Sequence, residues 1–234
     1  ALTRAQTRVW QDSETLWKNA VAVSGSGRAY HKLASLFEIQ EKYDEAIASY
    51  RQVAKIDPNR WDAHEKAALL LQKQGKIREA VEHFHSTVRI NPNATEARAN
   101  LAAGLVTQGE VTEAVKHFRK VLELAPERNE TRLRLGIILA LQGRLSEAAD
   151  MFQQVVKAEP GDAKALVKLG QVLAAQGNSE QAIAHFREAV RIQPEDAEAH
   201  ESLARALVDQ GKRDEAAKHL REALRILKSS PTSR

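Results

Sequence analysis

Apolar residues recur along the chain at spacings of three and four, which place them on one face of a helix. Leu101 and Leu105 lie in one such segment, and Ala148, Phe152 and Val155 lie in another. Polar residues fill the positions between them, and short stretches that contain Gly or Pro separate the segments. This pattern predicts pairs of amphipathic helices in which each pair is joined by a tight turn.

The predicted helices and turns repeat every 34 residues. Four columns of residues keep that step: a Gly, an Ala, a bulky residue four positions after the Ala, and a Pro. The Gly column contains Gly75, Gly109, Gly143, Gly177 and Gly211. The Ala column contains Ala46, Ala80, Ala114, Ala148, Ala182 and Ala216, and the bulky column contains Tyr50, Phe84, Phe118, Phe152, Phe186 and Leu220. The Pro column contains Pro58, Pro92, Pro126, Pro160 and Pro194.

Each column has a physical role in a helix–turn–helix unit. The Gly ends the first helix in a left-handed conformation, the Ala lets two helices approach closely, and the bulky residue fills the space between neighbouring units. The Pro ends the second helix. Asp162 and Asp196, two residues after a Pro, are expected to cap the next first helix. The residues expected to start second helices are Asp44, Thr112, Ser146, Ser179 and Asp214.

The pattern resembles the tetratricopeptide repeat (TPR), whose period is also 34 residues. In this register six units span residues 27–60, 61–94, 95–128, 129–162, 163–196 and 197–230. Glu41 replaces the Gly of the first unit and Lys228 replaces the Pro of the last, as expected for terminal repeats. The resemblance implies an all-α fold, a right-handed superhelix (α-solenoid) of six helix–turn–helix repeats. It also implies a concave groove that is lined by the first helix of each unit.

Residues 1–26 do not complete a unit, and residues 231–234 form a short tail. Asp12 or Ser13 is expected to cap a helix that covers the open face of the first repeat. The string Trp-x-Asp-Ser-x-x-Leu-Trp, which ends at Trp17, resembles a junction in membrane-anchored, glycosyltransferase-like proteins that carry TPR tails. This resemblance implies that the chain is the periplasmic or otherwise extracytoplasmic tail of a larger protein. Its attachment to a membrane would then be only through an upstream segment.

Composition excludes several kinds of chemistry. The chain has no Cys, which excludes disulfides, thiolate metal sites and Cys nucleophiles. Its 35 basic and 31 acidic residues nearly balance, so we expect no nucleic-acid partner. It contains no phosphate-binding loop, nucleophile elbow or metalloprotease motif. His83, His117, His185 and His219 share a column, but stacked helices lie too far apart for column neighbours to ligate one metal ion. We therefore expect no enzymatic activity, no cofactor and no metal site.

Residues that the packing of the repeats does not require are candidates for ligand binding. The resemblance implies that positions two, five, six, nine, twelve and thirteen of each unit face the groove. The candidate groove residues are Lys32, Lys66, Leu69, Ala99, Asn100, Ala103, Val106, Leu133, Arg134, Ile137, Val167, Lys168, Gln171 and Arg205. Apolar residues such as Leu133 and Ile137 occupy the centre, beside a ladder of basic residues. This arrangement predicts a protein or peptide ligand that is amphipathic and carries acidic groups. The alternative is that the apolar residues pack neighbouring first helices and that the basic residues are only solvated.

Three functions are compatible with the sequence. The first is a protein- or peptide-binding scaffold without catalytic activity. The second is an accessory tail that positions a substrate or partner for a membrane-bound, glycosyltransferase-like protein. The third is a structural spacer or assembly element, in which the uncovered face of the last helix, with Leu220, Leu224 and Leu227, mediates weak self-association. If the chain is not the tail of a membrane protein, we expect it to be cytoplasmic.

Overall fold

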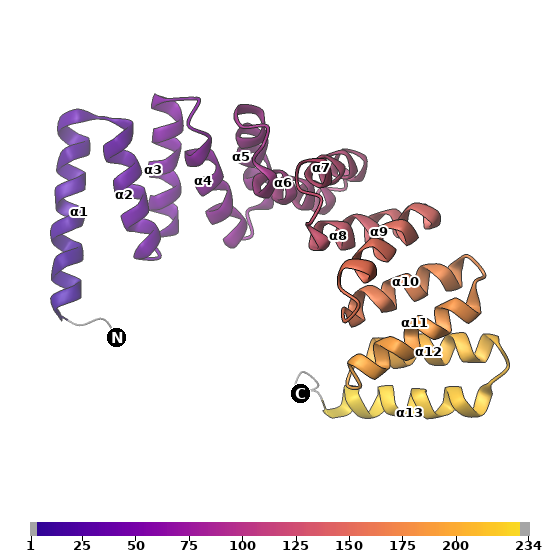
Figure 1. Cartoon of the computed structure of the whole chain (residues 1–234). Coiled ribbons are helices and arrows are strands. Elements are labelled where there is room, and N and C mark those ends of the chain that lie inside the picture. Colours follow the sequence, from indigo (N-terminus) through magenta and orange to yellow (C-terminus); the bar gives the residue numbers. More distant parts are fainter. Residues whose placement is uncertain (1–3, 230–234) are drawn as a thin grey trace. The chain divides into compact units, whose positions relative to one another are not determined.

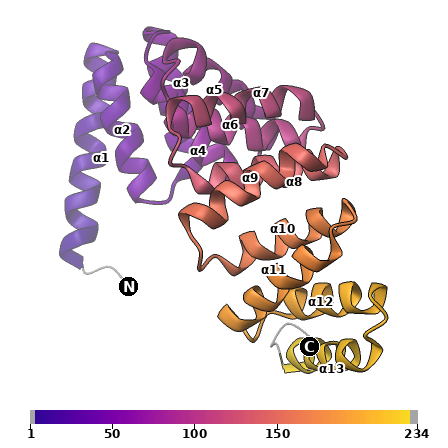
Figure 2. The ribbon, with the colours of Figure 1, turned by 45° about the vertical axis from the view of Figure 1, so that its right-hand side comes forward.

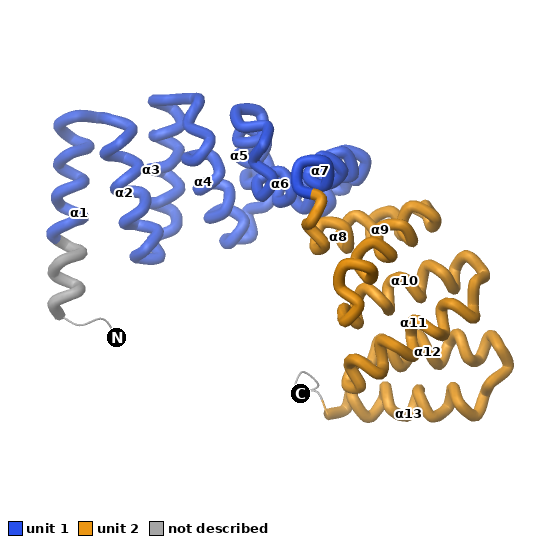
Figure 3. Tube along the Cα trace, viewed as in Figure 1, with its two compact units in different colours: residues 1–125 blue, residues 126–234 orange. Residues whose placement is uncertain are grey.

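A computed structural model describes the backbone of residues 4–229 and the side chains of residues 12–229. This part of the chain contains thirteen α-helices and no β-strand (Figures 1 and 2). The chain divides into two compact units, residues 1–125 and residues 126–234 (Figure 3). The predicted all-α class is confirmed, and the tail predicted over residues 231–234 lies outside the described part.

Unit 1 contains a long N-terminal helix followed by three helix pairs. Its helices are α1 (Arg4–Ser24), α2 (Gly27–Ile39), α3 (Tyr43–Ile56), α4 (Trp61–Lys73), α5 (Ile77–Ile90), α6 (Thr95–Thr107) and α7 (Val111–Leu124). From α1 to α6, each helix packs against the next one along the chain. The prediction that Asp12 or Ser13 caps α1 is wrong, because α1 begins well before both residues. This polar stretch lies inside the helix instead, and Glu14 accepts a hydrogen bond from Lys42 at the start of α3.

Unit 2 contains three further helix pairs. Its helices are α8 (Asn129–Leu141), α9 (Leu145–Ala158), α10 (Ala163–Ala175), α11 (Ser179–Ile192), α12 (Ala197–Asp209) and α13 (Arg213–Ser229). Sequential helices pack together, and α10 also contacts α8 and α12. We call α2, α4, α6, α8, α10 and α12 the first helices and their partners α3, α5, α7, α9, α11 and α13 the second helices. Within the described residues, no helix is both long and apolar enough to cross a lipid bilayer.

The Ala column and the aromatic column form the core of each helix pair. Every Ala of the column is buried, and so are Tyr50, Phe84, Phe118, Phe152 and Phe186. The packing roles that the sequence predicted for these columns are therefore confirmed. Leu220 differs, because 43% of it is exposed on α13 and no helix follows α13 among the described residues.

The turns confirm part of the predicted helix signals. Asp162 and Asp196 accept hydrogen bonds from backbone N–H groups in the first turns of α10 and α12, as expected. Ser179 is the first residue of α11, as expected, whereas α3, α7, α9 and α13 begin one residue before Asp44, Thr112, Ser146 and Asp214. The residues that precede α3, α7, α9 and α11 make no side-chain capping bond. The glycines of the Gly column have positive φ angles, such as 74° at Gly75. Glu41 takes the same conformation at 59°, which costs more for a residue with a Cβ atom.

Two glycines inside first helices let aromatic rings approach the backbone. A Cβ atom at Gly170 would lie 2.5 Å from Cε1 of Phe186, and one at Gly136 would lie 2.6 Å from Cε1 of Phe152. Both rings are buried, so neither can move away without disturbing its neighbours. These close approaches explain why a residue of poor helix propensity is found in the middle of each helix.

We expect Gly170→Ala to lower the free energy of unfolding by up to about 2 kcal/mol. Overpacking against the Phe186 ring costs about 1–3 kcal/mol. The better helix propensity of Ala offsets about 1 kcal/mol of this cost. Urea denaturation followed by circular dichroism measures this change. Gly27→Ala is the matched control, because its Cβ atom would meet Ile56 at an ordinary 3.7 Å. An equal loss of stability in both variants would contradict the packing role of Gly170.

Candidate functional site

The predicted groove residues of unit 1 come from α2, α4 and α6. Lys32, Lys66 and Leu69 are exposed, whereas Ala99, Asn100, Ala103 and Val106 are partly buried. Between α4, α5 and α6 the surface has a small hollow of about 80 Å³. Its lining residues are Gln72, Ile77, Ala80, Val81, Phe84, Asn100, Ala103, Gly104 and Thr107. Two of the predicted residues, Asn100 and Ala103, thus lie at one concave place in unit 1.

The predicted groove residues of unit 2 come from α8, α10 and α12. A hollow of about 290 Å³ lies between α8, α9 and α10. Its lining residues are Ile137, Ala140, Leu141, Leu145, Phe152, Lys168, Gln171, Val172 and Ala175. The structure brings three predicted residues together there: Ile137, Lys168 and Gln171. We call this hollow the first-helix pocket of unit 2.

The two hollows occupy equivalent places in the repeat. Moving two repeat lengths along the sequence takes Ile77 to Leu145 and Phe84 to Phe152. Every other lining residue of the unit 1 hollow except Ala80 and Val81 also shifts onto a lining residue of the unit 2 pocket. The hollow of unit 1 is narrower where Gly104 faces Val81, since a Cβ atom at Gly104 would lie 2.4 Å from that side chain. In unit 2 the smaller Ala149 stands where unit 1 has Val81. An equivalent hollow therefore occurs in both units, and its volume is larger in unit 2.

Apolar side chains form one wall of the first-helix pocket of unit 2. Ile137 and Leu141 are four residues apart and lie on the same face of α8. Leu141 is 84% exposed, which is unusual for a large aliphatic residue, and Ile137 is partly buried. The sequence pattern predicted Ile137 but passed over Leu141, although it stands at position thirteen of its unit. The pocket thus combines an exposed apolar edge with a polar opposite side.

The polar side of this pocket is a hydrogen-bonded cluster between α10 and α12. Lys168 Nζ lies 2.5 Å from a carboxylate oxygen of Glu198, and Gln171 donates to Glu198 at 2.9 Å and to Ser202 at 3.2 Å. The hydrogen bond from Lys168 and the one from Gln171 hold the pKa of Glu198 below its usual value, against the effect of burial. Lys168 and Gln171 are therefore held in place by a carboxylate of the same unit.

Ion pairs alter the predicted basic ladder. Lys66 lies 3.4 Å from Glu38, Arg134 contacts Glu130 at 2.5 Å, and Arg205 contacts Glu201 at 2.9 Å. Together with the pair of Lys168 and Glu198, four of the predicted basic residues already face a carboxylate. Exposed pairs of this kind contribute only about 0–1 kcal/mol, so a ligand can exchange for either partner at low cost. The ladder is consequently a row of mixed charge and not a positive stripe.

Val167 is the predicted groove residue that the structure removes from the surface. Only 1% of it is exposed, and it belongs to the buried cluster of unit 2 that includes Leu203 and Leu207 of α12. The prediction counted position five as a groove position in every unit. In this unit α12 packs against α10 and covers that position. Leu133, at the same position of the preceding unit, is only partly buried.

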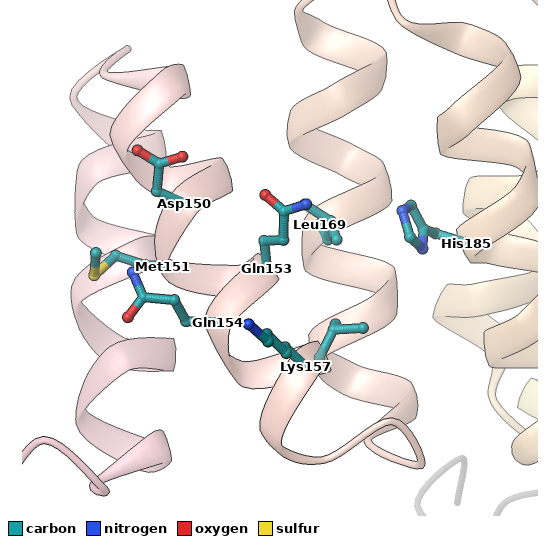
Figure 4. Close-up of a pocket in the computed structure, with 8 residues that line it drawn as sticks. Asp150, Met151, Gln153, Gln154, Lys157, Leu169 and His185 are labelled. Atoms are coloured by element: carbon teal, nitrogen blue, oxygen red, sulfur yellow. The ribbon is translucent and has the colours of Figure 1, made fainter.

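A second hollow of unit 2 lies among α9, α10 and α11 and has a volume of about 640 Å³ (Figure 4). Figure 4 shows Asp150, Gln153 and Gln154 projecting from α9, with His185 across the hollow on α11. Lys157 and Leu169 line the same space. Its polar lining is spread over separate turns and converges on no single point. Among residues 12–229, no group of three His, Asp or Glu side chains is arranged to hold a metal ion.

Comparisons with known proteins identify the repeat. The family description "Tetratricopeptide repeat" matches residues 65–129, 100–163, 133–197 and 167–231, and "TPR repeat" matches residues 34–75. No curated protein matches the sequence.

Several solved structures share the fold. One is YrrB, described as a TPR protein with an unusual peptide-binding site, with a TM-score of 0.71 at 24% identity over 78% of this chain and 95% of that chain. MamA from Desulfovibrio magneticus RS-1 gives a TM-score of 0.69 at 24% identity, over 73% of this chain and 97% of that one. PilF of Pseudomonas aeruginosa gives 0.65 at 18% identity, over 87% and 93%. The repeats matched to the family cover most of the sequence, and the chain therefore belongs to the tetratricopeptide-repeat family.

Proposed function

We propose that the chain is a protein- or peptide-binding scaffold and that its ligand contacts the first-helix pocket of unit 2. The observation that carries this proposal is the exposed apolar edge formed by Ile137 and Leu141 beside the polar cluster of Lys168 and Gln171. A few polar groups beside an apolar wall are typical of sites that bind a side chain in a fixed orientation. The repeats of this family typically form non-enzymatic scaffolds, and YrrB is itself described as binding a peptide.

Apolar contact is expected to supply most of the affinity. Burying Leu141 under a ligand removes an almost fully exposed side chain from water, and such burial contributes about 1.5–3 kcal/mol. The charge of Lys168 is already balanced by Glu198, so an acidic group on the ligand gains little by meeting it. The ligand that fits is therefore an amphipathic segment whose apolar residue enters the pocket, with polar groups against Gln171 and Lys168.

We expect Ile137→Asp and Leu141→Asp each to weaken peptide binding by more than tenfold. Peptides selected from a displayed random library on the wild-type chain serve as the ligand, and fluorescence anisotropy gives the dissociation constants. The introduced carboxylate loses the apolar contact and must be desolvated on binding. Lys168→Gln should change affinity less than threefold, because it removes a charge that Glu198 already balances.

Leu224→Asp is the matched control, since Leu224 is also an exposed leucine of unit 2 but lies on the second helix α13. The control should bind the selected peptides as the wild type does, and all variants should retain the helical circular dichroism spectrum. A folded Leu141→Asp variant that binds with unchanged affinity would place the ligand elsewhere on the chain.

A further inference from the structure

Two pairs of histidines face each other at equivalent places in different repeats. His64 of α4 and His83 of α5 have their Nδ1 atoms 3.1 Å apart, and His200 of α12 and His219 of α13 have theirs 3.0 Å apart. The ring centroids are separated by 5.3 Å and 5.2 Å. The sequence pattern compared histidines of neighbouring second helices, which are too far apart to share a ligand. It did not compare each of them with the first helix of its own pair, 19 residues earlier.

The hydrogen bonds of His200 fix the position of its proton. Its Nε2 atom lies 3.0 Å from the carbonyl oxygen of Pro194, and a carbonyl can only accept, so Nε2 carries the hydrogen. The Nδ1 atom of neutral His200 therefore presents a lone pair towards Nδ1 of His219. In the neutral pair, Nδ1 of His219 donates a hydrogen bond to Nδ1 of His200.

The two Nδ1 atoms lie close enough together for one metal ion to contact both imidazoles. Histidines that ligate metals usually donate their other ring N–H to a carbonyl or carboxylate, as His200 does to Pro194. Zinc–nitrogen bonds of about 2.0–2.1 Å place two nitrogen ligands of a tetrahedral ion roughly 3.3 Å apart. A separation of 3.0 Å reaches that value with a small rotation of the half-buried His219 ring. Two imidazoles with water molecules would then complete the coordination.

The charges around the pair also allow a cation. Glu215 and Glu222 of α13 lie near enough to interact electrostatically with His219 and His200, respectively. The positive charges of Arg187 and Lys218 act on His219 as well, and the guanidinium of Arg187 is hydrogen-bonded to Glu215 at 2.8 Å. Arg225 is in turn paired with Glu222 at 2.6 Å.

The pair in unit 1 has similar charges around it, since Arg51 is paired with Glu79 as Arg187 is with Glu215, but its hydrogen bonding differs. The Nε–H of Arg51 lies 3.4 Å from Nε2 of His83, which must therefore act as the acceptor. Binding a metal through Nδ1 would put a hydrogen on that Nε2 atom, directly facing the Arg51 donor. The charge of Arg89 also acts on His64. This pair is geometrically similar to the first, but the outer nitrogen of its second-helix histidine already faces a hydrogen-bond donor.

Arg98 shows that the bond to the turn carbonyl does not depend on a metal site. It stands at the position of His64 and His200, donates to the carbonyl of Pro92 at 2.6 Å, and faces His117 at 3.4 Å. The bond to the turn carbonyl is therefore a structural feature of the repeat. Among the described residues, only the pair in unit 2 combines that bond with two imidazoles whose Nδ1 atoms face each other.

We propose that His200 and His219 form a two-histidine site for a divalent transition-metal ion, of the Zn²⁺ or Ni²⁺ type, bound through the two Nδ1 atoms. Glu215 and Glu222 offset the positive charges of Arg187 and Arg225 beside it, and water provides the remaining ligands. His64 and His83 bind no metal under the same conditions, because the guanidinium of Arg51 donates to Nε2 of His83.

The test is a titration of the full chain, free of any histidine tag, with ZnCl₂ and with NiCl₂ at pH 7.5 by isothermal calorimetry. We expect one ion per chain. His219→Asn should weaken binding by more than tenfold, because the Asn amide keeps a donor near the Nδ1 position but removes the imidazole ligand. The matched variant His83→Asn should bind the metal as the wild type does. Circular dichroism shows whether each variant is folded.

Long-range ¹⁵N spectra of the imidazoles provide a second readout that does not depend on a variant. Zinc should shift the Nδ1 resonances of His200 and His219 and leave those of His64 and His83 in place. The proposal is wrong if no stoichiometric binding occurs, if His219→Asn binds as tightly as the wild type, or if His83→Asn weakens binding as much as His219→Asn does.

Discussion

Phe186→Ala should lower the free energy of unfolding by about 3–5 kcal/mol, the largest loss that we expect from a single substitution in this chain. Phe186 is 2% exposed and belongs to the cluster that joins α10, α11 and α12, together with Ala182, Leu203 and Ala199. The ring also lies against the backbone at Gly170, which has no side chain that could fill the cavity left by Phe186→Ala. Because a repeat contacts mainly its neighbours, the loss should be concentrated in these three helices.

Urea denaturation followed by circular dichroism measures the overall loss, and amide hydrogen exchange shows which helices open. Leu220→Ala is the matched control, since Leu220 stands in the same column but is 43% exposed on α13. It should cost only about 1 kcal/mol, because much of the side chain is already in water. Equal losses in the two variants would show that the bulky column does not stabilise the repeats by burial.

Acid should destabilise the fold between pH 6.5 and about pH 4, before most carboxylates titrate. Burial lowers the pKa of His83 to about 4, and the charges of His64 and Arg51 act in the same direction, while Glu79 opposes them. The pKa of His64 is lowered as well, by burial and by Arg89.

The sign of the effect follows from proton binding. Between pH 4 and 6.5 the unfolded chain holds a proton on this imidazole and the folded chain does not, so stability falls as the pH falls. Above pH 6.5 the contribution of His83 is fully present. The shift corresponds to about 3 kcal/mol, and water that reaches the half-exposed ring reduces it to about 1–2 kcal/mol.

Urea midpoints at pH 7.5 and pH 5.0 measure this dependence. His83→Asn should weaken it, since His64, His117, His185 and His219 also have lowered pKa values, whereas His85→Asn, an exposed position on the same helix, should leave it unchanged. The carboxylates act at lower pH: hydrogen bonds from Lys18 and Lys42 lower the pKa of Glu14 to about 2. A dependence that is the same in the wild type and in His83→Asn would contradict the account of the buried pair.

The repeat and its core could be predicted from sequence because packing imposes a fixed period on them. The Ala and aromatic columns are buried where the pattern placed them, since each helix pair must cover the next one. The caps of the second helices could not be predicted in this way. Their first turns are positioned by the Gly turn and by packing, so the polar residues there lie inside the helix and do not precede it.

The candidate site was predictable only in outline. The repeat position of Ile137, Lys168 and Gln171 placed them together, and the structure gathers them around one hollow. The burial of Val167 depends on how α12 covers α10, which no column records. The carboxylates that pair with the basic residues stand at other positions of the repeat. A column of basic residues therefore shows only the positive member of each ion pair.

The most direct test of the binding account is to locate a ligand on the protein at the level of single methyl groups. A chain with labelled Ile, Leu and Val methyl groups is titrated with a peptide selected on it, and intermolecular nuclear Overhauser effects are recorded. The account predicts contacts from the peptide to Ile137, Leu141 and Val172 of the first-helix pocket. Contacts confined to the exposed leucines Leu220, Leu224 and Leu227 of α13 would contradict it.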